Sequence, residues 1–293
     1  MNDLMRVDGA ASTTVAVGAR AIHLVEAGVG PALLMLHGGG PGAAGVSNFS
    51  RNVPALARRF RVLVPDLPGY GRSTKGLCRV DPFGDLAESM LGLLAALGIH
   101  RAAVVGNSLG GACALRMALE RPERVSRLVL LGPGGIGTSR GLPTPGLRRL
   151  FGYYGGDGPS LDKMRSFVRD DLVYDGQAVP EELIRARFES SIEPEVLANP
   201  PLLRPRSLSA LWRMDLTRDP RLAGLQTPTL VLWGTEDRVN RPSGGRLLQK
   251  RMPDCDLYLF SRTGHWVQWE RAEQFNAVTS AFLSQPDSGA DGT

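Results

Sequence analysis

The stretch AAVVGNSLGGA, at residues 102–112, decides the fold of this chain. Its first four residues form a short apolar run typical of a buried strand, and a helical pattern follows over residues 109–120. A sharp turn from strand to helix needs small residues on both sides, which Gly106 and Gly110 supply. Such a turn lifts the Ser108 hydroxyl into the open, where the helix N-terminus favours developing negative charge. The G-x-S-x-G pattern therefore predicts a nucleophilic serine, and the alternative is a glycine-rich packing turn.

Other short apolar runs also end in turn signals, and they predict a parallel sheet buried on both faces. These runs lie at residues 33–36, 61–64, 102–105, 127–131, 229–233 and 257–260. Helical patterns at 82–97, 109–120 and 271–283 alternate with them, and Asp81 is a candidate N-cap. Residues 14–17 and 22–25 straddle Gly18 and predict a leading antiparallel hairpin. Alternating strands and helices predict an α/β fold with a mostly parallel central sheet.

One segment interrupts this alternation and predicts an inserted helical lid. Residues 134–222 open on a Gly/Pro-rich stretch and then carry helical patterns at 161–172 and 180–190. We therefore expect a core formed by residues 1–133 and 223–284, a lid at 134–222, and a disordered tail at 285–293.

Composition excludes several other classes of protein. The 293 residues are 43% hydrophobic and 22% charged, which is globular composition rather than that of a disordered chain. No apolar run reaches the roughly 18–20 residues that span a bilayer, and residues 1–12 have no apolar signal region, so we expect a cytoplasmic protein without a membrane partner. The net charge of +5 comes from scattered cations, which argues against a nucleic-acid partner. Three distant cysteines without metal-ligand spacing make a metal site improbable.

A serine nucleophile needs a base, and His265 is the best of four histidines. It follows the strand pattern 257–260, so it lies at the edge where parallel sheets place their sites. The acid that would fix its tautomer is Asp237, after the strand at 229–233, with Glu236 as the fallback and Asp66 as a weaker candidate. The resulting chain order of serine, aspartate and histidine is that of the α/β-hydrolases.

A glycine run, His37-Gly38-Gly39-Gly40-Pro41-Gly42, follows the strand pattern 33–36. Its bare backbone beside the nucleophile offers N–H groups to an oxyanion, together with the N–H of Leu109 directly after the serine. Taken alone, a glycine run is only a flexible turn, but its position after the matching strand favours a functional role.

These features make the whole chain resemble the α/β-hydrolase superfamily and, within it, the meta-cleavage product hydrolases. The matching stretches are residues 37–43 with Asn48, 106–108, 132–135, and 264–266 with Gln268 and 275–276. The resemblance implies cleavage of a carbon–carbon bond in 2-hydroxy-6-oxo-dienoates from aromatic or steroid degradation, with no metal or organic cofactor. Residues 48–52 and 237–240 look most like the steroid-degradation branch. Family members are often homodimers or tetramers.

Carried over residue by residue, the resemblance assigns roles to ten positions. It implies a catalytic triad of Ser108, Asp237 and His265, and an oxyanion hole around Gly39, Gly40 and Leu109. Asn48, Asn107 and Trp266 would contact the dienoate end. Arg187 matches the carboxylate-binding arginine of the lid, because a planar guanidinium grips a carboxylate with two hydrogen bonds. Neighbouring Arg185 leaves that position open, as does the alternative of a solvated charge on an amphipathic helix.

Two further questions stay open at this level. A carboxylesterase or perhydrolase would use the same triad but would not need Asn107 or a lid arginine, and a catalytically silent receptor would usually lose a triad member. Several lid residues either line a wide apolar cavity for the tail of the substrate or simply pack the lid onto the core. They are Leu142, Leu147, Leu150, Phe151, Tyr153, Tyr154 and Met164.

Overall fold

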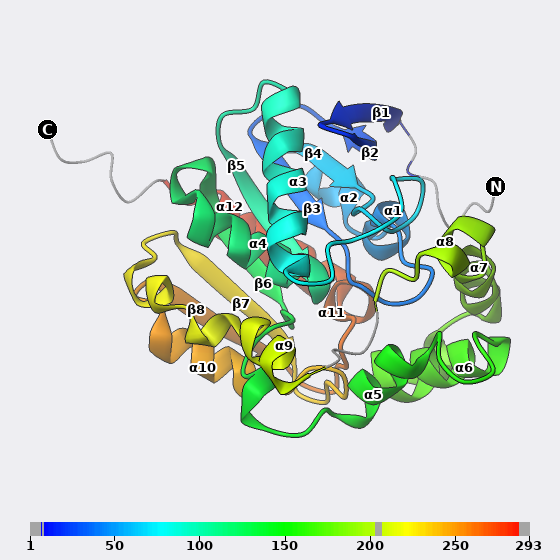
Figure 1. Cartoon of the computed structure of the whole chain (residues 1–293). Helices are drawn as coiled ribbons and strands as arrows, with labels where there is room; N and C mark the ends of the chain where they lie inside the picture. Colours follow the sequence, from blue (N-terminus) through cyan, green and yellow to red (C-terminus); the bar gives the residue numbers. More distant parts are fainter. Residues whose placement is uncertain (1–6, 8, 203–206, 287–293) are drawn as a thin grey trace, which may run out of the picture.

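The computed structural model describes residues 7, 9–202 and 207–286, and its strands form an eight-stranded sheet (Figure 1). The strand order is β1-β2-β4-β3-β5-β6-β7-β8. β1 pairs antiparallel with β2, and β2 with β4, whereas every other pair is parallel. The strands are β1 (Ala11–Val17), β2 (Arg20–Ala27), β3 (Ala32–Leu36), β4 (Arg61–Pro65), β5 (Ala102–Asn107), β6 (Val125–Leu131), β7 (Thr229–Gly234) and β8 (Cys255–Phe260). This confirms the predicted α/β fold with its leading hairpin.

The described residues form the five helices predicted from the sequence, with shifted ends, together with helices that the sequence analysis did not predict. They are α1 (Gly45–Phe49), α2 (Val53–Leu56), α3 (Pro82–Ala96), α4 (Leu109–Glu120), α5 (Pro145–Gly152), α6 (Leu161–Ser166), α7 (Glu181–Ser191), α8 (Pro194–Ala198), α9 (Leu208–Arg213), α10 (Ser243–Arg251), α11 (Val267–Glu270) and α12 (Ala272–Leu283). Asp81 caps α3 as predicted, because its side chain accepts a hydrogen bond from the Gly84 N–H. The predicted helix 161–172 is α-helical only to Ser166 and continues as a π-helix, Phe167–Leu172.

Apolar side chains on both faces of the sheet position the site. In β3, Leu34 and Leu36 pack among the residues of α3 and α4, whereas Leu33 and Met35 face α1, α2 and α12. This alternation follows from the two-residue period of a strand. Because helices cover both faces, the carboxyl ends of the parallel strands remain as the edge where loops gather.

The described residues between β6 and β7 form α5 to α9 and several short turns but no strand. We propose that this segment, 134–222, is the lid. Its apolar side chains form a third cluster that includes Leu150, Tyr153 and Phe167 and that reaches Trp266 on the sheet side. In the predicted tail 285–293, Gln285 and Pro286 are described, and 287–293 lie outside the described residues.

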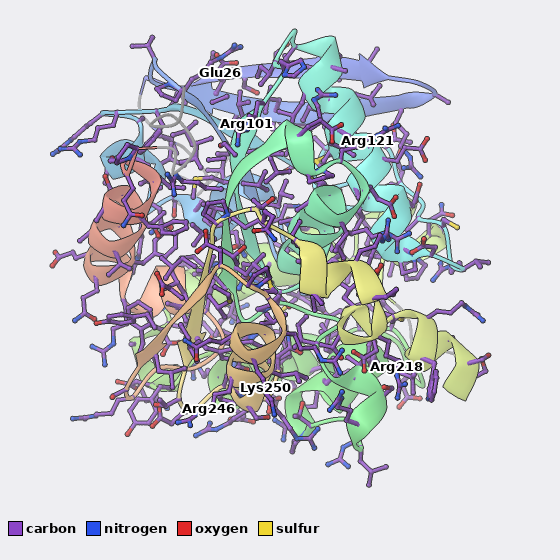
Figure 2. The ribbon with its side chains drawn as sticks, turned by 90° about the vertical axis from the view of Figure 1, so that its left-hand side faces the viewer. Glu26, Arg101, Arg121, Arg218, Arg246 and Lys250 are labelled. Carbon is purple, nitrogen blue, oxygen red and sulfur yellow. The ribbon has the colours of Figure 1, made fainter. Side chains whose placement is uncertain are left out.

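The surface charges are spread over separate elements. Figure 2 shows Arg101, Arg121 and Arg218 on separate segments, whereas Arg246 and Lys250 both lie on α10 (Ser243–Arg251). Among the described residues, no helix is long and apolar enough to cross a membrane, and no group of three or more His, Cys, Asp or Glu side chains is arranged to hold a metal ion.

Candidate active site

Ser108 occupies a strained turn between β5 and α4. Its φ is 52° and its ψ is −110°, a left-handed conformation that an L-residue seldom adopts. A Cβ at Gly106 would lie 2.3 Å from the Gly110 carbonyl oxygen, and one at Gly110 would lie 2.2 Å from the Leu36 oxygen. Only glycine therefore fits on either side of this turn. The serine stands where β5 meets α4, as the sequence predicts.

His265 and Asp237 form a buried pair beside this turn. The Nδ1 of His265 lies 2.7 Å from Oδ2 of Asp237, and both side chains are buried. The indole of Trp233 also donates to Oδ2, and the backbone N–H groups of Val239 and Asn240 donate to Oδ1. With its carboxylate held by these donors, Asp237 can accept a hydrogen bond from the Nδ1–H of His265, and this tautomer would leave Nε2 as the unprotonated ring nitrogen.

The other acidic candidates have different partners. Glu236 accepts a hydrogen bond from the Thr263 N–H at 2.9 Å, so it fastens the loop before His265 rather than the imidazole. Asp66 lies 2.8 Å from Nδ1 of His23 on the β2 strand. Desolvation opposes ionisation of Asp66, but its hydrogen bonds outweigh that effect and hold the pKa of the carboxyl below its usual value. Of the three, Asp237 is the one that contacts His265.

Ser108 and His265 line the same small cavity, of about 20 Å³. The described residues show no hydrogen bond between their side chains, a gap common in sites without substrate. The cavity brings together eight of the ten residues to which the sequence assigns roles, all except Leu109 and Asp237. Apart from aliphatic side chains and Phe167, the cavity is lined by Gly38, Gly39, Gly40, Asn48, Asn107, Ser108, Arg187, His265 and Trp266.

The glycine run borders this cavity, and its backbone is closely packed. A Cβ at Gly39 would lie 2.9 Å from Cδ2 of Leu109, and one at Gly40 would lie 2.7 Å from Nη2 of Arg187. His37 is a scaffold residue, since its Nε2 accepts from the Leu67 N–H and its Nδ1 donates to the Gly38 oxygen. Burial lowers the pKa of His37, which keeps it neutral.

Arg187 places a buried positive charge in the site. It is 2% exposed on α7, and its Nη2 donates to the Pro41 oxygen at 3.1 Å. Its Nε has no partner, no described Asp or Glu forms an ion pair with it, and the guanidinium lies 5.3 Å from the Trp266 ring centre. Burial lowers its pKa to about 10, so it remains a cation at neutral pH. Arg185 instead has a 58% exposed side chain, so of the two arginines Arg187 is the one that lines the cavity, and it is not a solvated surface charge.

Gln268 is a site residue to which the sequence assigned no role. Its Nε2 donates to Oδ1 of Asn48 at 2.6 Å, which leaves the amide N–H groups of Asn48 as donors toward the cavity. Asn107 is held differently, since its own Nδ2 donates to the Leu131 oxygen at 3.3 Å. Gln268 is among the residues that match the family pattern, and its position three residues after His265 is a second sequence signal for this contact.

A second, larger cavity of about 390 Å³ opens from Ser108 and Leu109 into the lid. Leu142, Leu147, Leu150 and Phe151 line it, as expected if lid residues form an apolar cavity for the tail of the substrate. The other three of these lid residues pack inside the lid instead. Tyr153 and Met164 belong to the lid cluster, and Tyr154 packs against that cluster.

Comparison with known proteins gives a consistent result. The family model for the alpha/beta hydrolase fold matches residues 31–193 and 194–272. The chain is 40% identical over 267 residues to a 2-hydroxy-6-oxo-6-phenylhexa-2,4-dienoate hydrolase of Burkholderia cepacia, covering 90% of this chain and 91% of that protein. It is also 40% identical over 267 residues to a 2-hydroxy-6-oxononadienedioate/2-hydroxy-6-oxononatrienedioate hydrolase of Comamonas testosteroni, with the same coverage.

Solved structures agree with these relatives. A 2-hydroxy-6-oxo-6-phenylhexa-2,4-dienoate hydrolase from Rhodococcus sp. strain RHA1 superimposes with a TM-score of 0.81 at 30% identity, over 94% of this chain and 99% of that one. A serine hydrolase from the polyaromatic hydrocarbon-degrading bacterium Cycloclasticus zankles gives a TM-score of 0.86 at 27% identity, over 97% and 100% of the two chains.

Proposed function

Because this chain belongs to the α/β-hydrolase fold family, and within it to the meta-cleavage product hydrolases, we propose that it hydrolyses a carbon–carbon bond in 2-hydroxy-6-oxo-dienoates. We assign Ser108 as nucleophile, His265 as base and Asp237 as the acid that orients it. Gly39, Gly40 and Leu109 would hold the oxyanion through their backbone N–H groups.

The reaction requires several proton transfers, and His265 takes part in most of them. First, the proton of the substrate's 2-hydroxyl moves to C5, which converts the dienol to a ketone. Ser108 Oγ then bonds to C6 as its proton passes to His265 Nε2, and the C5–C6 bond breaks with its electron pair leaving on the dienoate fragment. That fragment takes the proton from His265. Water next attacks the acyl-serine with His265 as base, which releases a carboxylic acid and a 2-hydroxypenta-2,4-dienoate-type product.

The observation that carries this proposal is the buried, unpaired Arg187. A cation with 2% exposure and no described acidic partner is costly unless a ligand supplies the anion. It shares a cavity with Ser108 and His265, so the anion would belong to the substrate itself. The C1 carboxylate of a dienoate satisfies this need, whereas a simple neutral ester does not.

The larger cavity supports a bulky tail on C6. Its volume of about 390 Å³ lies in the range of pockets that hold drug-sized ligands. Leucine side chains and Phe151 supply much of its wall, so we favour an apolar tail with at least one ring. A steroid-type tail, as residues 48–52 and 237–240 suggest, remains our prediction for the branch.

The decay of the coloured dienoate chromophore tests the proposal. Steady-state rates would be compared for methyl-tailed, phenyl-tailed and steroid-derived dienoates and for p-nitrophenyl acetate. We expect kcat/KM for the preferred dienoate to exceed that for the ester, with Ser108→Ala binding the dienoate without cleaving it. Ester hydrolysis without dienoate turnover would instead indicate a carboxylesterase or perhydrolase.

We also propose a cytoplasmic enzyme that acts as a homodimer or tetramer, without a metal or organic cofactor and without a nucleic-acid or membrane partner. Light scattering on the purified chain measures the oligomeric state. Activity that survives dialysis against EDTA is expected, and its loss would contradict the absence of a metal.

A further inference from the structure

We propose that Glu270 is a positioning residue that holds the His265 loop against the end of the lid's π-helix. One side chain would thereby fix the positions of both His265 and this part of the lid. The inference rests on the proposed function of His265. Glu270 is the last residue of α11, and it has no part in the mechanism above.

The two carboxylate oxygens of Glu270 fasten two distant segments. Oε1 accepts a hydrogen bond from the N–H of Gly264, directly before His265, at 2.8 Å. Oε2 accepts one from the N–H of Tyr174, two residues after the π-helix ends, at 2.7 Å. A single carboxylate thus bridges chain segments that are 90 residues apart in sequence. A shorter or singly accepting side chain would not hold both.

Backbone contacts join the same two segments directly. The Leu172 oxygen accepts hydrogen bonds from the N–H groups of both His265 and Trp266, at 2.9 and 3.1 Å. A Cβ on Gly264 would lie 2.7 Å from the Val173 carbonyl carbon, so only glycine allows this approach. A movement of the lid at residues 172–174 therefore displaces His265. The two hydrogen bonds of Glu270 resist that movement.

The electrostatic setting of Glu270 makes this clamp sensitive to pH. The pKa of Glu270 is raised to about 7, chiefly by burial and to a smaller extent by nearby Asp237, while the two backbone hydrogen bonds and Arg271 oppose the rise. Arg262 lies beside Tyr174, with its guanidinium 5.9 Å from the Tyr174 ring centre. As the pH falls through about 7, the carboxylate gains a proton and can no longer accept two N–H groups equally. The clamp is complete only on the alkaline side.

Glu270→Gln tests the proposal, with Glu273→Gln as the matched control because Glu273 is exposed three residues further along. We expect Glu270→Gln to lower the rate of acyl-enzyme formation about 10- to 100-fold, as displaced catalytic groups typically do. The acid limb of its pH–rate profile should also move to lower pH, because the titration of Glu270 is gone. The control should stay within twofold of wild type.

Acylation by p-nitrophenyl acetate is the primary readout because it needs the triad but not a dienoate. If wild type acylates without cleaving dienoates, the proposed function fails while the role of Glu270 is still tested. An unchanged acylation rate in Glu270→Gln overturns the proposal, and so does a lower rate with an unmoved acid limb. Thermal unfolding of each variant checks that it is folded.

Hydrogen exchange of the wild-type protein decides the matter if Glu270→Gln does not fold. Protection of the Gly264 and Tyr174 amides, corrected for intrinsic exchange, should fall about tenfold or more between pH 8 and pH 6. Equal protection at both pH values would overturn the proposal, because protonation of Glu270 would then leave the clamp intact.

Discussion

Replacing Arg187 with methionine should separate carboxylate recognition from triad chemistry. Methionine keeps an unbranched apolar side chain on α7 but removes the buried cation. The carboxylate of a dienoate loses its cationic partner, whereas p-nitrophenyl acetate has no carboxylate that needs one. We therefore expect a selective loss of dienoate turnover with ester hydrolysis preserved.

The size of this loss can be worked out from the structure. Burial lowers the pKa of Arg187 from 12.5 to about 10, which corresponds to roughly 3 kcal/mol spent on keeping the cation buried. Charge-assisted hydrogen bonds to a bound carboxylate return about 1.5–3 kcal/mol each. Without them, kcat/KM for the dienoate should fall by roughly 10²–10³, since about 1.4 kcal/mol is a factor of ten.

The same substitution should not weaken the folded protein. Both the folded and the unfolded chain carry the charge at neutral pH, below both pKa values, so the full cost of burial is present there. Removing it offsets the lost hydrogen bond to the Pro41 oxygen and the contact with Trp266, each worth about 0.5–2 kcal/mol. The unfolding temperature should therefore match or exceed that of wild type.

Arg185→Met is the control, because Arg185 is exposed and its ion pair with Glu181 is 3.9 Å long. It should leave both activities within twofold of wild type. The reasoning is refuted if Arg187→Met keeps its dienoate kcat/KM, if it loses ester hydrolysis to the same extent, or if Arg185→Met causes the selective loss instead.

Three further substitutions test other parts of the site. Ser108→Gly should abolish turnover yet raise the unfolding free energy by about 1 kcal/mol, since glycine relieves the left-handed φ of 52°; unchanged chemical denaturation would contradict this. Asp237→Asn should lower kcat by about 10³–10⁴, because an asparagine favours the wrong tautomer of His265. Glu236→Gln should lower kcat less than tenfold. Similar losses of kcat in the two variants would contradict the choice of Asp237 over Glu236. Gln268→Leu should raise the dienoate KM about tenfold, because it removes the hydrogen bond that orients the Asn48 amide. In the Gln268→Leu background, Asn48→Ala should then change KM less than twofold. Additive effects of the two substitutions would contradict a role of Gln268 through Asn48.

Much of the fold and the triad could be predicted from the sequence because their signals are local. The strand at residues 102–105, the glycines around Ser108 and the helix to Glu120 follow one another within twenty residues. A buried parallel strand reads as an apolar run, and a tight turn requires glycine wherever a Cβ would clash. A similarly local pattern, an apolar run just before it, predicted that His265 follows a strand and lies at the edge where parallel strands end.

Other features depended on which segments pack together, and no local pattern carried them. Residues Arg185 and Arg187 both lie on α7, and only the packing of that helix against the glycine loop buries one and exposes the other. Adjacent Glu236 and Asp237 point to different partners, a choice that depends on how their loop meets the loop of His265.

The clamp by Glu270 shows the same limit most clearly. Nothing near Glu270 in sequence indicates that its carboxylate reaches Tyr174 in the lid, 96 residues away. The sequence by itself determined the order of the elements and the chemistry available at their ends, because periodicity and turn residues act over a few positions. Only the tertiary structure decided which charges are buried and which groups meet, because burial and long-range hydrogen bonds arise when distant segments pack and exclude water.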